Sequence, residues 1–235
     1  MTHETLSSVL ARANGGGGPE VLLPFPLTAT VVWATLWLEA PSPDTAERRQ
    51  EGDKVYLIHN GQQYVAIVLD LGPLDLHWFV LPEHRGQHYL STALRDVILP
   101  HLFQDGRTSQ RITISRNFGQ RPFEASEKLA LAVGFEHLPP GEDDTPSVAT
   151  LQYVPADLDA LPFFEGLQLL PSAERMQQLR RQLAYHACSL QMLSEEMAMY
   201  LPGDTLPENL VGLGIEVMNM ADKLEKTFQE IAEQG

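Results

Sequence analysis

Cysteine and positive charge are both scarce in this chain of 235 residues. The one cysteine, Cys188, cannot form a disulfide within the chain, and this fits a reducing compartment. Lys and Arg number 16 against 31 Asp and Glu, which gives a formal net charge of −15 at pH 7. Nucleic acid is therefore a poor partner, because binding to phosphates needs clustered Lys and Arg.

Long apolar runs are missing as well. No uninterrupted apolar segment approaches the roughly 20 residues that cross a bilayer, and the sequence does not open with a basic segment followed by an apolar one. We therefore expect a cytoplasmic protein without a membrane partner. Hydrophobic residues make up 43% of the chain and charged residues 20%, which is enough apolar material for a sizeable core.

Short β-rich runs separated by turn residues fill the first part of the chain. A pair of residues that both accept positive φ, Asn60-Gly61, lies between two of these runs and predicts a tight type I′ hairpin. A first run, Leu27–Leu38, predicts a strand. Three further runs predict an antiparallel meander, and they are Val55–His59, Gln62–Leu69 and Leu74–Leu81.

After Pro82 the apolar residues recur at the spacing of a helix. This pattern predicts a helix from about Tyr89 that ends near Pro100 to Gly106. Gly134 is well placed as the left-handed end of a second helix. The segments that follow the first helix are a strand at Gln110–Ser115, a helix at Phe123–Val133 and a last strand at Ser147–Val154.

The C-terminal part has apolar residues spaced by three and four in two segments, with Leu201–Pro207 between them. We predict an antiparallel helical hairpin with heptad-like seams, which packs on the first domain or on a second copy of itself. The first seam is Met176, Leu179, Leu183, His186, Leu190, Leu193, Met197 and Tyr200. The second is Leu210, Gly214, Val217, Ala221, Leu224, Phe228 and Ile231.

The predicted fold class is α+β. Residues 1–155 form a mixed, mostly antiparallel sheet flanked by helices, and residues 156–235 form the helical hairpin extension.

The run from Val80 to Leu94, VLPEHRGQHYLSTAL, resembles the coenzyme-binding signature of the GNAT N-acetyltransferases. The family pattern is Arg or Gln, two residues, Gly, one residue, then Gly or Ala. Arg85 matches the first position, whereas His88 and Leu90 stand at the two small-residue positions. The segment Ser126–Phe135 is similar to the closing helix of the family, which ends in Gly-Phe. The resemblance covers about residues 27–154.

The resemblance implies that acetyl-CoA is the acyl donor and that its pyrophosphate lies on the turn before the helix. Backbone N–H groups and the helix dipole favour an anion there. The N–H groups of Val80 and Leu81 would polarise the thioester carbonyl. Leu90 either blocks the phosphate or points into the core, and His88 either binds a phosphate or is only an exposed loop residue. The implied binding residues are Val80, Leu81, Arg85, Gly86, Gln87, His88, Tyr89, Leu90 and Ser91.

Acyl transfer to an amine also needs a group that takes the ammonium proton. Asp75 and His77 lie on the strand before the signature, and the ordinary pKa of His suits this role better. The alternative for His77 is a structural histidine satisfied by a neighbour. The Tyr that many family members place four residues before the terminal Gly is Ala130 here, which removes a general acid worth roughly 10²-fold. No His pair has the spacing of a zinc-binding helix, so we predict no metal.

A local basic cluster has two interpretations. Its side chains either help Arg85 to hold coenzyme phosphates or pair with the many acidic side chains of the chain. The cluster comprises Arg107, Arg111, Arg116 and Arg121.

Two functions therefore remain open, beside a plain α+β binding protein. One is a GNAT-like N-acyltransferase that moves an acetyl group to a primary amine. The other is a catalytically inactive protein of the same fold that dimerises or binds a partner through the C-terminal helices. A gap between the strands that end near Leu81 and Ser115 favours the first function. A gap filled by Leu90, Tyr89 or the hairpin favours the second.

Overall fold

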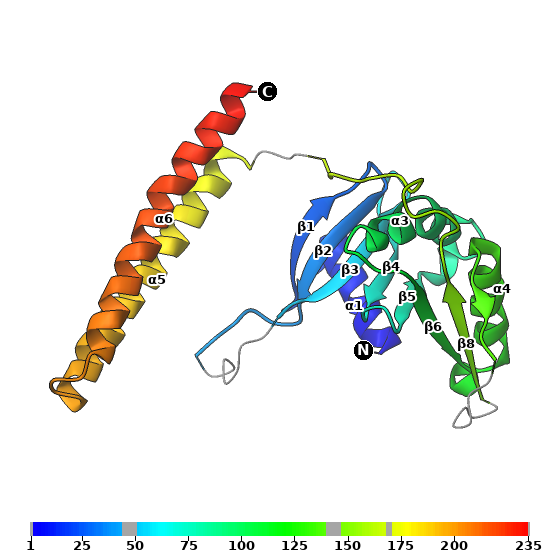
Figure 1. Cartoon of the computed structure of the whole chain (residues 1–235), viewed down its shortest axis with the longest axis horizontal. Helices are drawn as coiled ribbons and strands as arrows, with labels where there is room; N and C mark the ends of the chain where they lie inside the picture. Colours follow the sequence, from blue (N-terminus) through cyan, green and yellow to red (C-terminus); the bar gives the residue numbers. More distant parts are fainter. Residues whose placement is uncertain (1, 44–50, 140–146, 168–170, 235) are drawn as a thin grey trace. The chain divides into compact units, whose positions relative to one another are not determined.

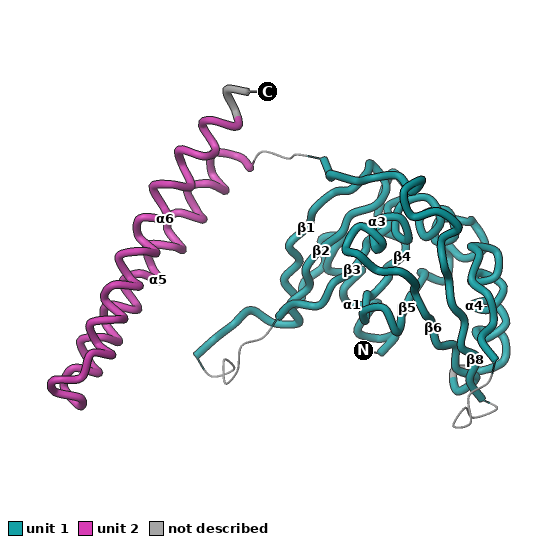
Figure 2. The backbone as a smooth tube through the Cα atoms, in the orientation of Figure 1, with its two compact units in different colours: residues 1–167 teal, residues 168–235 magenta. Residues whose placement is uncertain are grey.

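The structure is a computed structural model that describes residues 2–43, 51–139, 147–167 and 171–234. The chain divides into two compact units, residues 1–167 and 168–235 (Figures 1 and 2). The first unit is a mixed α+β structure and the second is a pair of helices, so the predicted fold class is confirmed. Among the described residues no helix is both long and apolar enough to cross a membrane.

Five strands form an antiparallel sheet in chain order, and the last three of them are the predicted meander. The strand β1 is not predicted from the sequence, because its two prolines, Pro24 and Pro26, argue against a strand. They are tolerated because β1 is an edge strand, where missing N–H donors cost little. The strands are β1 (Val21–Pro26), β2 (Val31–Trp37), β3 (Asp53–His59), β4 (Tyr64–Asp70) and β5 (Leu76–Val80).

The turn between β3 and β4 differs from the predicted type I′ hairpin. Only Gly61 has a positive φ, of 99°, and the loop is longer, with the N–H of Asn60 donating to the carbonyl of Gln63 at 3.0 Å. The side-chain oxygen of Asn60 accepts from the N–H groups of Gln62 and Gln63, at 3.0 and 2.9 Å. These bonds hold Asn60 outside the left-handed region, because its side chain caps the turn.

The two faces of the sheet pack against different elements. On one face lies α1 (His3–Ala13), and its Leu6, Val9 and Leu10 are fully buried in a core with β2, β3 and β4. The other face carries the larger core, which includes the helical segment after β5 and the elements that follow it.

The helical segment after β5 runs from Tyr89 to Phe103 and ends where the sequence predicts. Its parts are α2 (Tyr89–Ala93), the π turn η2 (Leu94–Ile98) and α3 (Leu99–Phe103). Pro100 has no N–H to donate to the carbonyl four residues before it. The π turn contains that carbonyl, at Asp96, and a π turn inserts one extra residue into the helix.

The remaining elements of the first unit form a three-stranded sheet and a helix. The strand order is β6–β8–β7, with β6 at Gln110–Ser115, β7 at Glu136–His137 and β8 at Val148–Tyr153. The helix α4 (Gln120–Val133) ends at Gly134, whose φ of 106° confirms the predicted left-handed end. Short 3-10 turns lie at Pro82–His84 (η1) and Arg116–Phe118 (η3).

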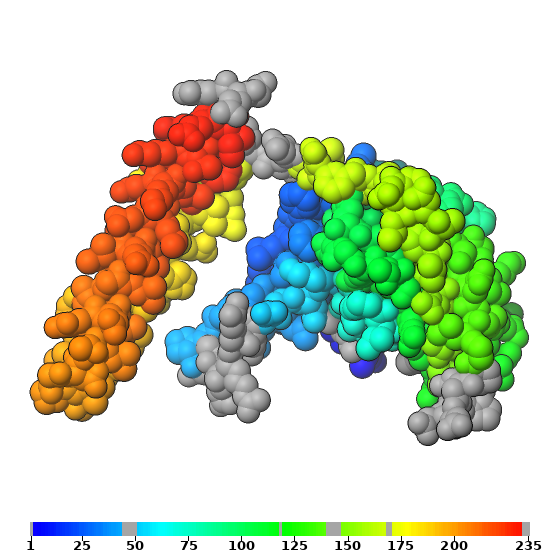
Figure 3. Space-filling model, viewed as in Figure 1, coloured from blue at the N-terminus to red at the C-terminus, as the bar shows by residue number. Residues whose placement is uncertain are grey.

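The second unit consists of α5 (Ala173–Tyr200) and α6 (Leu206–Gln234), which confirms the predicted hairpin. The two helices pack against each other (Figures 1 and 3). Small buried residues, Ala187 and Ser194 of α5 with Gly214 and Ala221 of α6, form the centre of their seam. The Oγ of Ser194 donates to the carbonyl of Pro207 at 2.6 Å across this seam.

The predicted seam of α5 is wrong in part. His186, Leu193 and Tyr200 are exposed, and Ala187 and Ser194 take the buried positions one residue later in the chain. Hydrophobicity predicts the larger side chains for the seam. The close approach selects small ones, since a Cβ added at Gly214 would lie 3.2 Å from the carbonyl oxygen of Ala187.

Candidate functional site

The strands β5 and β6 are joined at one end only. The N–H of Arg111 donates to the carbonyl of Pro73 at 2.9 Å, and the N–H of Thr113 donates to Oδ1 of Asp75 at 2.8 Å. Both partners advance in the same direction, so the two segments run parallel here. Beyond this junction the described strands have other ladder neighbours, β4 for β5 and β8 for β6. The two strands therefore diverge and leave a gap.

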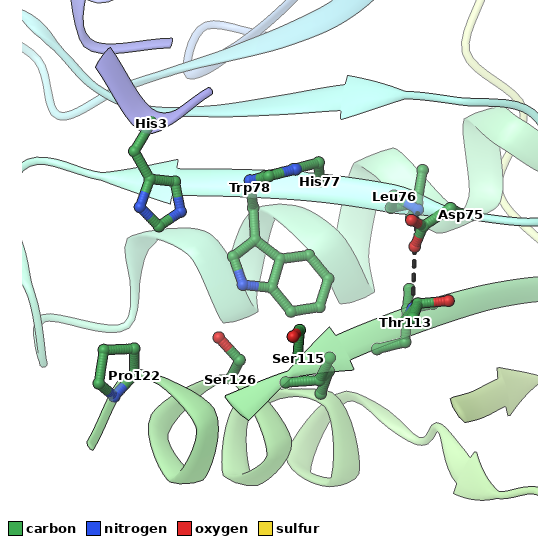
Figure 4. Close-up of a pocket in the computed structure, with 11 residues that line it drawn as sticks. His3, Asp75, Leu76, His77, Trp78, Thr113, Ser115, Pro122 and Ser126 are labelled. Atoms are coloured by element: carbon green, nitrogen blue, oxygen red, sulfur yellow. Dashed lines mark hydrogen bonds between the residues drawn. The ribbon is translucent and has the colours of Figure 1, made fainter. Parts of the chain in front are cut away.

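A pocket of about 310 Å³ opens in this gap (Figure 4). Its walls come from the start of α1, from β5 and β6, and from the first turns of α4. The indole of Trp78 reaches from β5 into the space above Ser115 and Ser126. The lining residues are His3, Asp75, Leu76, His77, Trp78, Ile112, Thr113, Ile114, Ser115, Pro122 and Ser126.

Asp75 forms the closed end of the gap. Its Oδ1 accepts from the N–H of Leu76 at 3.0 Å as well as from that of Thr113. Burial raises the pKa of Asp75 above its ordinary value, although these two hydrogen bonds oppose the shift. The side chain of Asp75 thus links the five-stranded sheet to the three-stranded sheet.

His77 lies on the α1 face of β5, beside His3. The two rings meet edge to face with their centroids 5.4 Å apart. Burial lowers the pKa of His77, and the positive charge of His3 lowers it further. The neutral imidazole is therefore the favoured form of His77 at pH 7, and it can accept a proton.

The turn after β5 carries backbone N–H groups with no protein acceptor. Among the described residues no acceptor lies within hydrogen-bonding distance of the N–H groups from Gly86 to Ser91, and the first helical bond runs from Thr92 to the carbonyl of His88 at 3.0 Å. Gly86 and His88 have φ of 75° and 62°, and His88 is the only described non-glycine residue with positive φ. Left-handed residues within a turn bring successive N–H groups together into a concave anion site.

The end of β5 differs from the expectation at Leu81. The N–H of Leu81 donates to the carbonyl of Val65 at 3.0 Å, so it belongs to the pairing with β4. Because N–H groups alternate along an antiparallel strand, the N–H of Val80 points to the other edge, toward the gap. Arg85 folds back to this edge, with its Nε donating to the carbonyl of Val80 at 3.2 Å.

Neither large residue of the turn fills the gap. Leu90 is 4% exposed and lies in the larger core, and Tyr89 packs against the same core. Neither side chain lines the pocket.

The side chain of Arg107 is already bound by other residues of the first unit. Its guanidinium binds both carboxylate oxygens of Asp70, at 2.6 and 3.1 Å, and Oε1 of Gln110 at 2.7 Å. Arg116 lies over the ring of Phe123, with its Cζ 4.6 Å from the centroid. Arg107 therefore follows the second interpretation of the basic cluster, which is pairing with an acidic side chain.

Of the lining residues, only Asp75 and His77 are predicted as site residues; the missed ones include His3, Trp78, Ser115 and Ser126. Ser126 lies one helical turn before Ala130, so helical spacing gives a signal for it. Trp78 directly follows His77 on the same strand, so its position next to a predicted site residue is a signal as well. No sequence signal identifies His3, because its place depends on how α1 packs on β5. Ala130 itself is fully buried in the core.

Comparisons with known proteins give a similar solved structure but no family. No family model matches the chain, and no curated protein matches it. Among solved structures, the chain is similar to the acetyltransferase from Agrobacterium tumefaciens str. C58, with 17% identity and a TM-score of 0.34. The match covers 43% of this chain and 60% of that chain, which is less than two thirds of the neighbour.

Proposed function

We propose that the first unit is a GNAT-like N-acyltransferase, which moves an acetyl group from acetyl-CoA to a primary amine. The observation that carries this proposal is the gap between β5 and β6, followed directly by a turn with free N–H groups from Gly86 to Ser91. A free strand edge accepts an extended chain by main-chain hydrogen bonds. Free N–H groups at a helix start accept a phosphate.

In this proposal the signature turn acts through its backbone. The N–H groups of Gly86, Gln87, His88, Tyr89, Leu90 and Ser91 would hold the pyrophosphate. The buried side chain of Leu90 is compatible with this role, because only its N–H faces the turn. Arg85 adds positive charge beside the turn once it leaves the Val80 carbonyl. The N–H of Val80 is available to polarise the acyl carbonyl.

Acetyl-CoA supplies an activated acyl group in the form of a thioester. The amine nitrogen would form a bond to the carbonyl carbon, and the carbon–sulfur bond would break, with its electron pair leaving on the thiolate. His77 would take the proton lost by the attacking nitrogen, because its neutral form is favoured at pH 7. Asp75 would position β6 rather than accept the proton. The net charge of −15 favours a cationic acceptor.

A thermal-shift titration of the full chain with acetyl-CoA tests the proposal, with free CoA and ATP as companion ligands. Ligand at about a hundred times its dissociation constant adds roughly 2.7 kcal/mol of stability. We expect a raised melting temperature with acetyl-CoA and CoA but not with ATP. No shift at millimolar acetyl-CoA would overturn the proposal.

A charge variant localises the binding. Gln87→Glu places a negative charge at the turn, and we expect it to weaken acetyl-CoA binding by about tenfold, because about 1.4 kcal/mol of repulsion is typical of neighbouring charges. Gln177→Glu on the exposed surface of α5 is the matched control with the same net charge. Equal affinities of the two variants would place the coenzyme away from this turn.

The second candidate is a protein of this fold that binds without catalysis. Two observations favour it: the indole of Trp78 reaches into the gap, and Ala130 offers no hydroxyl to protonate a leaving thiolate. A thiol-release assay with acetyl-CoA and a panel of primary amines separates the two functions. Binding without thiol release supports this second candidate, and amine-dependent release excludes it.

A further inference from the structure

The helical hairpin has a second line of apolar side chains outside its seam. On each helix they are the residues that directly precede the seam residues. Each residue of a helix lies 100° around the helix axis from the residue before it. Because the two helices run in opposite directions, the residues that precede the seam residues lie on the same flank of the pair. We name this line the outer stripe, which consists of Leu179, His186 and Leu193 on α5 and Leu206, Leu213 and Met220 on α6.

The opposite flank has a different character. It carries the residues that directly follow the seam residues, namely Arg181, Cys188, Glu195, Glu208, Ile215 and Asp222. Arg180, at the seam position seven residues before Ala187, forms ion pairs with Asp222 of this flank at 3.8 Å and with Glu225 at 2.7 Å. The outer stripe contains no acidic residue, and His186 is its one basic side chain. The outer stripe is therefore apolar at five of its six positions, whereas the opposite flank carries four charged residues beside Cys188 and Ile215.

Five of the six residues of the outer stripe are exposed within the described part of the chain, and Leu179 is half-buried. Leu193 is 45% exposed and Leu213 is 47% exposed, each seven residues from the helix end at the α5–α6 connection. The close seam of Ala187, Ser194, Gly214 and Ala221 brings α5 and α6 together, so the two halves of the stripe form one continuous surface. Contiguous exposed apolar surface of this kind marks an interaction site.

We propose that the outer stripe binds the same stripe of a second copy of this chain, so that two hairpins form a four-helix bundle. Three properties select a second copy as the occupant. The spacing by seven residues on both helices is that of bundle cores, and a hairpin provides two of the four helices. An apolar stripe without opposite charges is complementary to itself, as a two-fold interface requires.

Size is the third property. The helices have 28 and 29 residues, which corresponds to about 42 Å at 1.5 Å per residue. Two neighbouring helices are about 20 Å wide, so the flank offers about 800 Å² per copy, the area of a stable interface.

Sedimentation equilibrium of the full chain, from about 1 to 100 µM, tests this proposal independently of acyl transfer. We expect a species of twice the chain mass of 26.2 kDa. Leu193→Glu and Leu213→Glu should each raise the dimer dissociation constant about a hundredfold or more, because each copy then buries a charge in an apolar interface. Both variants should keep the helical circular dichroism of the wild type, since neither residue lies in the seam.

Met192→Glu and Ile215→Glu are matched controls. Both residues are apolar and exposed, by 63% and 57%, but they lie off the outer stripe. We expect these controls to dimerise like the wild type. A wild-type protein that stays monomeric at 100 µM would overturn the proposal and leave the stripe to the first unit of the chain or to another protein. Equal dimer dissociation constants for the control variants and the stripe variants would also overturn the proposal.

Discussion

Oδ1 of Asp75 accepts a hydrogen bond from the backbone N–H of Thr113 at 2.8 Å, and this bond ties the five-stranded sheet to the three-stranded one. A side chain thus takes the place of a main-chain carbonyl at the point where the two strands separate. The position of the gap depends on this one acceptor and on the bond from Arg111 to the carbonyl of Pro73.

Asp75→Asn should raise the melting temperature at pH 7, whereas Asp75→Ala should lower the stability by about 1 kcal/mol. Asn keeps an oxygen for the N–H of Thr113 and removes the buried charge, but Ala leaves that N–H without its partner. Because the pKa of Asp75 is raised in the folded state, its contribution is present below pH 3.8 and is lost as pH rises through the folded pKa. Melting curves at pH 3.5 and pH 7 check this, and the advantage of Asn should vanish at the lower pH.

His3→Ala should raise the pKa of His77, because the charge of His3 contributes to lowering it. The pKa should stay below 6.5, since burial is the larger cause. The depressed pKa of His77 gives stability that is present above pH 6.5 and lost as pH falls through the folded pKa. Histidine NMR titrations of the wild type and the variant measure the shift. An unchanged or lower pKa of His77 in His3→Ala would contradict the contact.

Arg107→Met should destabilise the first unit by about 3–5 kcal/mol, because it leaves the carboxylate of Asp70 buried without its partner. The two side chains are only 12% and 8% exposed, so water cannot replace the lost bonds. Chemical denaturation gives the free energy of unfolding. The control is Arg95→Met, which removes a pair of exposed side chains, Arg95 and Asp96, and should change stability little. Similar losses in both variants would argue against a special role for burial.

Gly134→Ala should cost about 1–2 kcal/mol, because the φ of 106° is unfavourable for a residue with a Cβ. The added Cβ would also lie 3.3 Å from the ring of Tyr153, which packs against the larger core. The free energy of unfolding of this variant, compared with Gly72→Ala in an open loop, isolates the contribution of the ring contact. Equal costs would show that backbone strain alone matters at Gly134.

The order of the strands and helices after Asp53 is predictable from the sequence, because local signals decide it. Hydrophobic period, proline positions and Gly134 locate β3 to β5, α4 and the hairpin. The strand β1 is not predictable in the same way, since its prolines are permitted only by its edge position. The seam of α5 shows the same limit. Apolar spacing identifies both Leu193 and Leu190, but only the contact with Pro207 of α6 explains the burial of Ser194.

The candidate site is predictable in part. The signature turn and the strand with Asp75 and His77 follow from the motif and its neighbours. Three other features depend on contacts between distant segments. They are the pairing of Leu81 with Val65, the hydrogen bond of Asp75 to Thr113 and the position of His3 in the pocket. Such contacts leave no periodic pattern in a single sequence.

The π turn at Leu94–Ile98 has a consequence for the signature turn that lies before it. One extra residue in a helix changes the phase between its two ends by about 100°. Deleting one residue between Leu94 and Ile98 would leave α3 in its place in the core and rotate Tyr89 and Leu90 around the helix axis. The free N–H groups would then aim away from the end of β5. The direction of the N–H groups in this turn thus depends on the number of residues in the π turn, some five to ten positions downstream. The sequence of the signature turn itself would not have to change.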